Sequence, residues 1–222
     1  GYNEYLEFYS RNNGKGDLFD SIKENIENKG SCIIPIEFYL IGYKTKEGNY
    51  IDGIGVPGAN IRVYRTPDLW MHFEKSVRSE LDDWITYLNN TYGKTTNGKL
   101  GFSLKSFETK EYSIDELIEG IDLPGDNAEE FNGSLIVRFE PRILSAHNYG
   151  VEQASYSGIG LVEIFYEAIS KSKSSALAHE IGHGIFGYDH HEERGCLMDP
   201  KIDSEDLYFC QECNNTLVKL IS

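Results

Sequence analysis

The segment His179-Glu180-Ile181-Gly182-His183 combines residue types that can bind and use a metal ion. Residues four positions apart on an α-helix share one face, so the imidazoles of His179 and His183 can converge on one zinc ion at roughly 2.0–2.1 Å each. Glu180 flanks such an ion. Zinc lowers the pKa of a bound water to about 7, so a carboxylate suffices as the general base. The segment therefore predicts a zinc-dependent hydrolase.

The residues around this segment indicate where its helix ends and where a third ligand is found. A solvated helix with two surface histidines is the alternative interpretation, but the small and apolar neighbours Ala178 and Ile181 argue against it. Gly187 can adopt a positive φ and end the helix, which turns the chain back towards the metal. His190, three residues later, is then the predicted third ligand.

The chain has four cysteines, and three of them, Cys196, Cys210 and Cys213, lie close together near the C-terminus. Such clustering is more typical of metal ligation than of a disulfide framework, which distributes its bridges through a smaller chain. Free thiols suit a reducing compartment, so a cytoplasmic location is expected. Cys32 is predicted to be a buried apolar residue.

From His179 to Cys213 the sequence resembles the metzincin metallopeptidases, whose pattern is H-E-x-x-H-x-x-G-x-x-H followed by a Met-turn. It is most similar to the archaemetzincin branch. In that branch a Cys after the third His is followed by four residues, then by C-x-M and finally by C-x-x-C. Here His191 stands in place of the first Cys, and Cys196-Leu197-Met198 supplies the C-x-M. The resemblance implies a zinc peptidase that acts on peptide or protein substrates.

The resemblance also implies a second, structural zinc ion. The ligands carried over for it are His191, Cys196, Cys210 and Cys213. A Cys₃His set suits tetrahedral zinc, whereas a Cys210–Cys213 disulfide and metal-free buried thiols are the alternatives. Met198 matches the Met-turn, an apolar platform beneath the catalytic zinc. Two zinc ions per chain are therefore expected.

The chain departs from the family pattern before the third ligand. Three residues separate His183 from Gly187 where the family has two, so the helix must run on by one residue or bulge before it turns. Asp189 keeps the family's distance from His183, whereas His190 keeps the distance from the Gly that determines the turn. His190 is preferred, and Asp189 and His191 stay open as third ligands.

Composition and charge limit the partners. Asp and Glu number 36 against 21 Lys and Arg, which gives a net charge of −15. That charge repels phosphate backbones and anionic lipid, so neither nucleic acid nor a membrane is an expected partner, and the chain is expected to be a monomer. No window approaches the roughly 18 consecutive apolar residues that span a bilayer. The start lacks the features of a signal peptide, but it is also not Met, so a removed targeting segment stays open.

Helical and strand patterns alternate along the chain, which predicts an α+β fold with a mixed sheet. The predicted strands are 33–43, 60–65, 100–107, 134–139 and 158–166, and the predicted helices are 17–28, 67–92, 113–119, 172–186 and 204–221. A Ser-x-x-Glu capping box opens the helix at Ser113. The strand at 158–166 resembles the metzincin edge strand, to which an extended peptide can add; an interior strand is the alternative.

Together these features predict a single zincin-like (metzincin) domain over residues 1–222, with a mixed sheet, a long backing helix and an active-site helix. Residues 1–30 would form an N-terminal extension, and residues 187–222 a small zinc-stabilised C-terminal part. The predicted function is a zinc metallopeptidase with Glu180 as general base. Three alternatives stay open: an aminopeptidase-type exopeptidase, a non-catalytic zinc-stabilised binding module, and a gluzincin-like site that uses Glu205 as a ligand.

Overall fold

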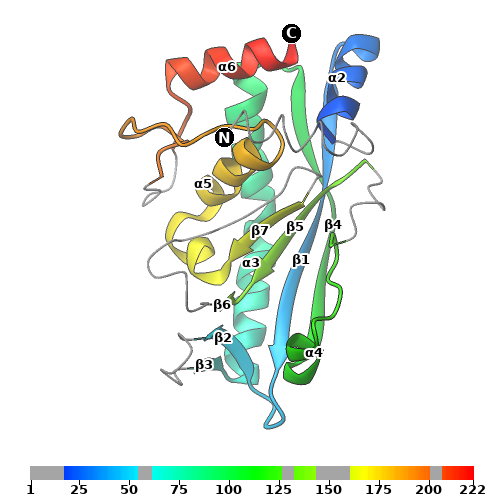
Figure 1. Ribbon diagram of the computed structural model, residues 1–222, viewed down its shortest axis with the longest axis vertical. Coiled ribbons are helices and arrows are strands. Elements are labelled where there is room, and N and C mark those ends of the chain that lie inside the picture. The colour runs from blue at the N-terminus through cyan, green and yellow to red at the C-terminus, as the bar shows by residue number, and fades with distance from the viewer. Residues whose placement is uncertain (1–17, 55–61, 127–132, 144–160, 201–206) are drawn as a thin grey trace.

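The computed structural model describes residues 18–54, 62–126, 133–143, 161–200 and 207–222 (Figure 1). The chain is α+β with a mixed sheet, as predicted. In chain order its elements are α2 (Leu18–Lys29), β1 (Cys32–Lys44), β2 (Tyr50–Ile54), β3 (Arg62–Arg65), α3 (Pro67–Leu88), the π-helix η1 (Asn89–Gly93), β4 (Leu100–Ser113), α4 (Ile114–Glu119), β5 (Leu135–Glu140), β6 (Arg142–Ile143), β7 (Leu161–Phe165), α5 (Tyr166–Gly184) and α6 (Gln211–Ile221).

Strand β1 is the centre of the sheet. It pairs in parallel with β4 on one side and with β5 on the other, and β5 pairs in parallel with β7. The antiparallel pairs β1–β2 and β2–β3 make the sheet mixed. Among the described strands β7 lies at one end of the strand order, and residues 158–160 of the predicted strand fall outside the described residues.

The sheet has two different faces because side chains alternate along each strand. On one face of β1, Ile36, Phe38 and Leu40 are fully buried against α3 and α5. The opposite face carries Ile41 and Tyr43, which belong to a smaller cluster together with residues of α4. Figure 1 shows α3 running along most of the length of the sheet, with α5 beside it. The main core therefore lies between the sheet and these two helices.

Helix α3 begins where its sequence predicts a start. Thr66 accepts a hydrogen bond from the backbone of Leu69, and Pro67 occupies the first helical turn. The predicted helix over 67–92 ends as α-helix at Leu88 and continues as the π-helix η1. This change brings Tyr92 fully into the core.

Helix α5 follows β7 directly, and its C-terminal half is buried. Leu177 and Ile181 on this helix, and Ile185 just after it, are at most 2% exposed and belong to the main core. The described residues between α5 and α6, 185–200 and 207–210, have little regular structure. The buried side chains of α6, Cys213, Leu217 and Ile221, close this end of the core.

Some boundaries differ from those predicted. Strand β2 lies between the predicted strands 33–43 and 60–65, where no strand was predicted, and the C-terminal helix begins at Gln211 instead of 204. Leu207 to Cys210 are not helical because Tyr208 forms a β-bridge with Cys196. The helix α2, expected within an N-terminal extension, packs three side chains into the main core: Leu18, Ile22 and Ile26.

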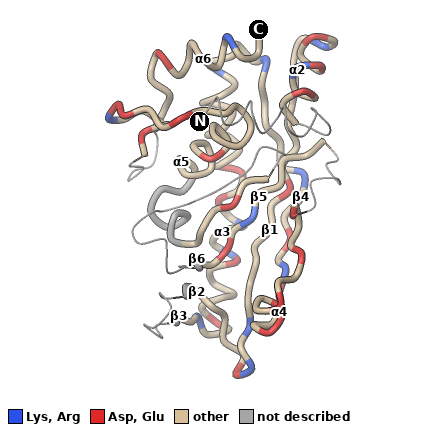
Figure 2. Tube along the Cα trace, viewed as in Figure 1, with Lys and Arg blue, Asp and Glu red and all other residues tan. Residues whose placement is uncertain are grey.

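Charged residues are distributed over most of the described elements. Figure 2 shows acidic residues on most of the helices and on β4, with Lys and Arg distributed among them. No helix within the described residues has the length and apolar character to cross a bilayer.

Candidate metal centre

Helix α5 presents His179 and His183 one turn apart, as their spacing predicts. His179 is 4% exposed and His183 is half-buried. Their Nε2 atoms lie 2.9 Å apart, and their ring centroids are separated by 4.6 Å. The two side chains therefore point towards the same place.

Each of these rings is held by a backbone carbonyl. His179 Nδ1 lies 2.7 Å from the carbonyl oxygen of Leu197, and His183 Nδ1 lies 2.6 Å from that of Tyr188. A carbonyl oxygen can only accept a hydrogen bond, so each Nδ1 carries a proton and donates it. The Nε2 atom of each neutral ring is then unprotonated, and two lone pairs face each other. A shared cation turns this repulsion into attraction.

Burial keeps both rings in the neutral form that binds metals. It lowers the pKa of His179 to about 3, with the neighbouring charge of His183 as the next cause. The pKa of His183 is also lowered, again mainly by burial. At neutral pH, therefore, protons do not compete with a metal ion for the unprotonated nitrogen of either ring.

His190 joins these two residues from the loop that follows α5. Its ring centroid lies 5.3 Å from that of His179 and 4.7 Å from that of His183. Ligand atoms of the three histidines all lie within 4.8 Å of one another, and this set is called the histidine site below. Asp189, which stayed open as a ligand, is exposed and is not part of the set.

The extra residue between His183 and Gly187 is absorbed at the end of the helix. The amide of Gly187 still donates to the carbonyl of His183 in the helical manner, at 3.2 Å. The amide of Tyr188 then reaches back six residues to the carbonyl of Gly182, at 2.9 Å. Gly187 has a φ of 67°, which L side chains rarely adopt. The helix thus runs on and closes with a wide turn that brings His190 back.

Glu180 lies on the same buried part of α5 and is 6% exposed. Its carboxylate is close enough to Tyr92 to contribute to the raised pKa of that phenol, although burial is the largest cause. The Tyr92 hydroxyl donates to the carbonyl of Ala178 at 2.6 Å. Sequence patterns did not single out Tyr92, which the π-helix places against α5.

Met198 packs directly against α5. A methyl group added at Gly182 would lie 2.7 Å from Met198 Sδ and 3.2 Å from its Cε. Met198 itself is fully buried. The absence of a side chain at Gly182 therefore lets Met198 approach the helix between the two histidines.

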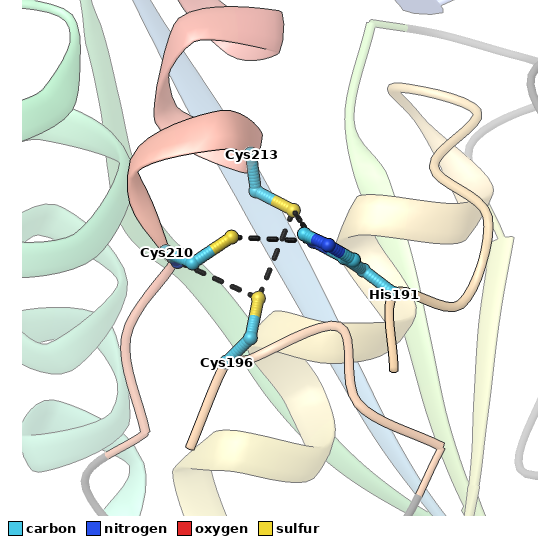
Figure 3. Close-up of side chains that lie close together, drawn as sticks. All are labelled: His191, Cys196, Cys210 and Cys213. Carbon is cyan, nitrogen blue, oxygen red and sulfur yellow. Dashed lines mark hydrogen bonds between the residues drawn. The ribbon is translucent and has the colours of Figure 1, made fainter. Parts of the chain in front are cut away.

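A second cluster, of one histidine and three cysteines, involves the residue next to His190 in the chain (Figure 3). His191 Nδ1 is 3.2 Å from Cys210 Sγ and 3.3 Å from Cys213 Sγ, and Cys196 Sγ is 3.7 Å from Cys213 Sγ. All three thiols are free, so no disulfide joins Cys210 to Cys213. These four residues, His191, Cys196, Cys210 and Cys213, are called the thiol site below.

The electrostatics of the thiol site favour a cation. Burial raises the pKa of Cys213, and its neighbours Cys196 and Cys210 raise it further. The pKa of Cys210 is raised mainly by burial as well. Three sulfur atoms so close together are costly to ionise without a positive charge between them. Thiolate and imidazole donors suit transition metals rather than Mg²⁺ or Ca²⁺.

Two contacts of the candidate metal centre have no signal in the sequence, because they use backbone carbonyls. These are the bonds from the histidines to Leu197 and Tyr188. Two tyrosines also lie in this part of the chain. The hydroxyl of Tyr188 donates to the carbonyl of Cys213, whereas Tyr208 is 49% exposed and packs its ring against Tyr87. Glu205 lies outside the described residues.

No protein-family model matches the chain, and no curated protein matches it significantly.

Proposed function

We propose that the protein is a zinc metallopeptidase of the metzincin type, similar to the archaemetzincins. One observation carries the proposal: His179 and His183 have their Nδ1 atoms bound to carbonyls and their Nε2 atoms 2.9 Å apart, with His190 completing the set. A general-base candidate, Glu180, follows the first of these histidines in the chain. The sequence pattern and the donor geometry thus support the same chemistry.

Zinc fits both donor sets. Tetrahedral zinc with bonds of about 2.0–2.1 Å to nitrogen places two nitrogens about 3.3 Å apart, and the observed Nε2–Nε2 separation of 2.9 Å is about 0.4 Å shorter, a difference that a small rotation of either ring removes. Three histidine ligands leave a fourth position open, which is typical of catalytic zinc. The thiol site offers four ligands, and tetrahedral zinc with bonds of about 2.3 Å places two sulfurs about 3.8 Å apart. The observed 3.7 Å between Cys196 and Cys213 is close to this value, so the thiol site suits a closed structural ion.

The chemistry then divides between the ion and the chain. When bound, zinc supplies a Lewis acid that polarises the scissile carbonyl and lowers the pKa of a water in the open position to about 7. Glu180 accepts the proton of the attacking water and later delivers it to the leaving amine. The carbonyls of Leu197 and Tyr188 keep the imidazoles of His179 and His183 facing the ion.

The substrate in this proposal is an extended peptide or protein segment. Strand β7 lies at one end of the described strand order and leads directly into α5, which carries the histidine site. A peptide that pairs with the free edge of a strand gains backbone hydrogen bonds without regard to its sequence. The enzyme is proposed to act as a cytoplasmic monomer, without nucleic acid or membrane as a partner.

The test is to replace Glu180 with Gln and to measure hydrolysis of a peptide library together with zinc content. We expect Glu180→Gln to reduce hydrolysis by about 10²–10⁴-fold, because it removes the general base, while two zinc ions per chain remain bound. Glu24→Gln, at an exposed position on α2, is the matched control and should leave both measurements unchanged.

Two results of the same experiment bear on the alternatives. If the zinc-loaded parent protein hydrolyses no peptide in the library, the enzyme proposal is wrong and the chain is a zinc-stabilised binding module. Peptides with blocked and free N-termini distinguish the two kinds of peptidase. Cleavage of blocked peptides supports an endopeptidase, whereas a strict requirement for a free amine supports an aminopeptidase.

A further inference from the structure

The histidine site and the thiol site share one segment of chain. Residues 187–199 leave α5, supply His190 to one site and His191 with Cys196 to the other, and have little regular secondary structure. Such a segment gains its order from side-chain contacts, because it lacks the repeated hydrogen bonds of a helix or a sheet. Each histidine of the first site is connected to the second site through this segment or through the start of α6.

The connection to the third histidine is the peptide bond itself. His190 and His191 are consecutive, and they belong to different sites. The amide of His191 donates to the carbonyl of Met198 at 2.9 Å, and its ring reaches Cys210 and Cys213. In the part of the chain that the structure describes, no hydrogen bond holds the His190 ring as Leu197 and Tyr188 hold the others. The position of His190 therefore depends on that of His191.

The connection to His179 runs through Leu197. The carbonyl of Leu197 accepts the bond from His179 Nδ1, and its neighbour Cys196 is a member of the thiol site. The Cys196 sulfur also accepts hydrogen bonds from the amides of Met198 and Cys210, at 3.5 and 3.4 Å. An anchored Cys196 thus fixes the carbonyl that orients His179.

The connection to His183 runs through Tyr188. Its carbonyl accepts the bond from His183 Nδ1, and its hydroxyl donates to the carbonyl of Cys213. Tyr188 is 6% exposed and stacks on Phe209, so its side chain has little freedom to move independently. Cys213 belongs to the thiol site. All three histidines are therefore positioned by residues that belong to, or directly contact, the second cluster.

We propose that the thiol site is a positioning element for the histidine site: a metal ion bound there orders the shared segment and raises the affinity of the three histidines for their own ion. The thiol site then fills first. The inference rests on the proposed function for the identity of the metal, zinc. Ordering the segment before the second ion binds removes an entropic cost from that step. Mutation of a residue that hydrogen-bonds to a metal ligand typically lowers metal affinity by about 10–100-fold.

The experiment measures zinc affinity of the full chain by competition with a chromophoric chelator. Co²⁺ is the second probe, because only the thiol site gives absorption from thiolate-to-cobalt charge transfer. In the parent chain we expect this absorption to saturate with the first equivalent of Co²⁺. Cys210→Ser should abolish tight binding at the thiol site and lower the zinc affinity of the histidine site by about 10–100-fold.

Two variants serve as controls. His191→Cys keeps four metal ligands and should retain the high affinity of the histidine site. Cys32→Ala removes a buried thiol that belongs to neither site and should change neither affinity. An unchanged histidine-site affinity in folded Cys210→Ser overturns the proposal, and so does a histidine site that fills before the thiol site.

Tyr188→Phe keeps the inference testable if Cys210→Ser does not fold. This change removes only the hydroxyl that reaches Cys213 and leaves every proposed ligand in place. It should lower histidine-site affinity by about threefold to tenfold, the usual worth of one hydrogen bond. An unchanged affinity overturns the proposal. Hydrolysis is not the readout, so a protein with coupled sites that cleaves no peptide contradicts only the proposed function.

Discussion

The contact between Gly182 and Met198 shows how a single residue determines the shape of the candidate metal centre. Gly182 lies between the two histidines of α5, at the position where the fully buried Met198 approaches the helix. An alanine at an ordinary helix position would be favoured over glycine by about 1 kcal/mol. Here its methyl group would lie 2.7 Å from Met198 Sδ, so the methionine or the helix must move.

Gly182→Ala is therefore expected to destabilise the protein by about 1–3 kcal/mol, the usual cost of overpacking, and to weaken zinc binding at the histidine site. Thermal unfolding and chelator competition measure the two effects. Gly101→Ala is the control, since its added methyl would lie 3.6 Å from the nearest atom, an ordinary contact. In a Met198→Ala background the cost of Gly182→Ala should disappear, and equal costs in both backgrounds would contradict the steric explanation.

The side chains of the candidate site could be predicted from the sequence, but the backbone groups that hold them could not. Candidate metal-binding side chains can be recognised in a sequence by their type and spacing. The structure brings three of them, His179, His183 and His190, into one group. The carbonyls of Leu197 and Tyr188 have no such signal, because every residue carries one. Their role depends on how the chain folds back over α5, which side-chain spacing does not encode.

Among the secondary-structure elements, β5 and β7 bring a buried arginine together with two carboxylates, and a third comes from the segment after α4. Arg138 forms ion pairs with Asp126, Glu140 and Glu163, and its side chain is 3% exposed. Burial raises the pKa of Glu140 from its ordinary 4.5 to about 7; Glu163 and Asp126 raise it as well, and Arg138 opposes the shift. Arg138, Glu140 and Glu163 lie on the strand pair β5–β7, and β7 leads directly into α5.

The raised pKa of Glu140 predicts a pH-dependent stability. Between pH 4.5 and about 7 the folded protein holds a proton that the unfolded chain releases, so this contribution falls as the pH rises through that range. The full change is on the order of 3 kcal/mol. Denaturant unfolding of the parent and of Glu140→Gln measures it: the parent should lose stability relative to the variant from pH 4.5 to 7. Glu108→Gln, exposed on β4, should show no such trend, and parallel pH profiles for parent and Glu140→Gln would contradict the prediction.

Elements with local signals were predicted well, whereas those defined by distant contacts were not. The capping box at Ser113 forms as expected, with Glu116 bonding back to the Ser113 amide. Helix α6 starts later than predicted because Tyr208 pairs with Cys196, which is distant in the sequence. Strand β2 was missed because its five residues, YIDGI, contain a glycine and an aspartate, which are unfavourable in strands. Its partners lie on β1, β3 and β6.

In the molecule as a whole, two parts of the chain differ in the interactions that stabilise them. The sheet and α3 are held by a large apolar core, in which β1 pairs with β4 over its full length. The part from 187 onwards contains both the third histidine and the whole thiol site, and its described residues before α6 have little regular secondary structure. Metal binding should therefore matter most for this part, since binding free energy becomes folding free energy where no site is preformed.

Hydrogen exchange before and after chelation tests this division. Chelation should speed exchange at least about tenfold at the amides of Tyr188, His191 and Leu197, whose hydrogen bonds lie between the two sites. The amides that pair β1 with β4 should keep their protection, because apolar burial and not metal stabilises that region. Equal acceleration throughout the chain would instead mean that the ions fold the entire domain. Unchanged exchange everywhere would mean that the segment between the sites is ordered without them, and the thiol site would then have nothing to position.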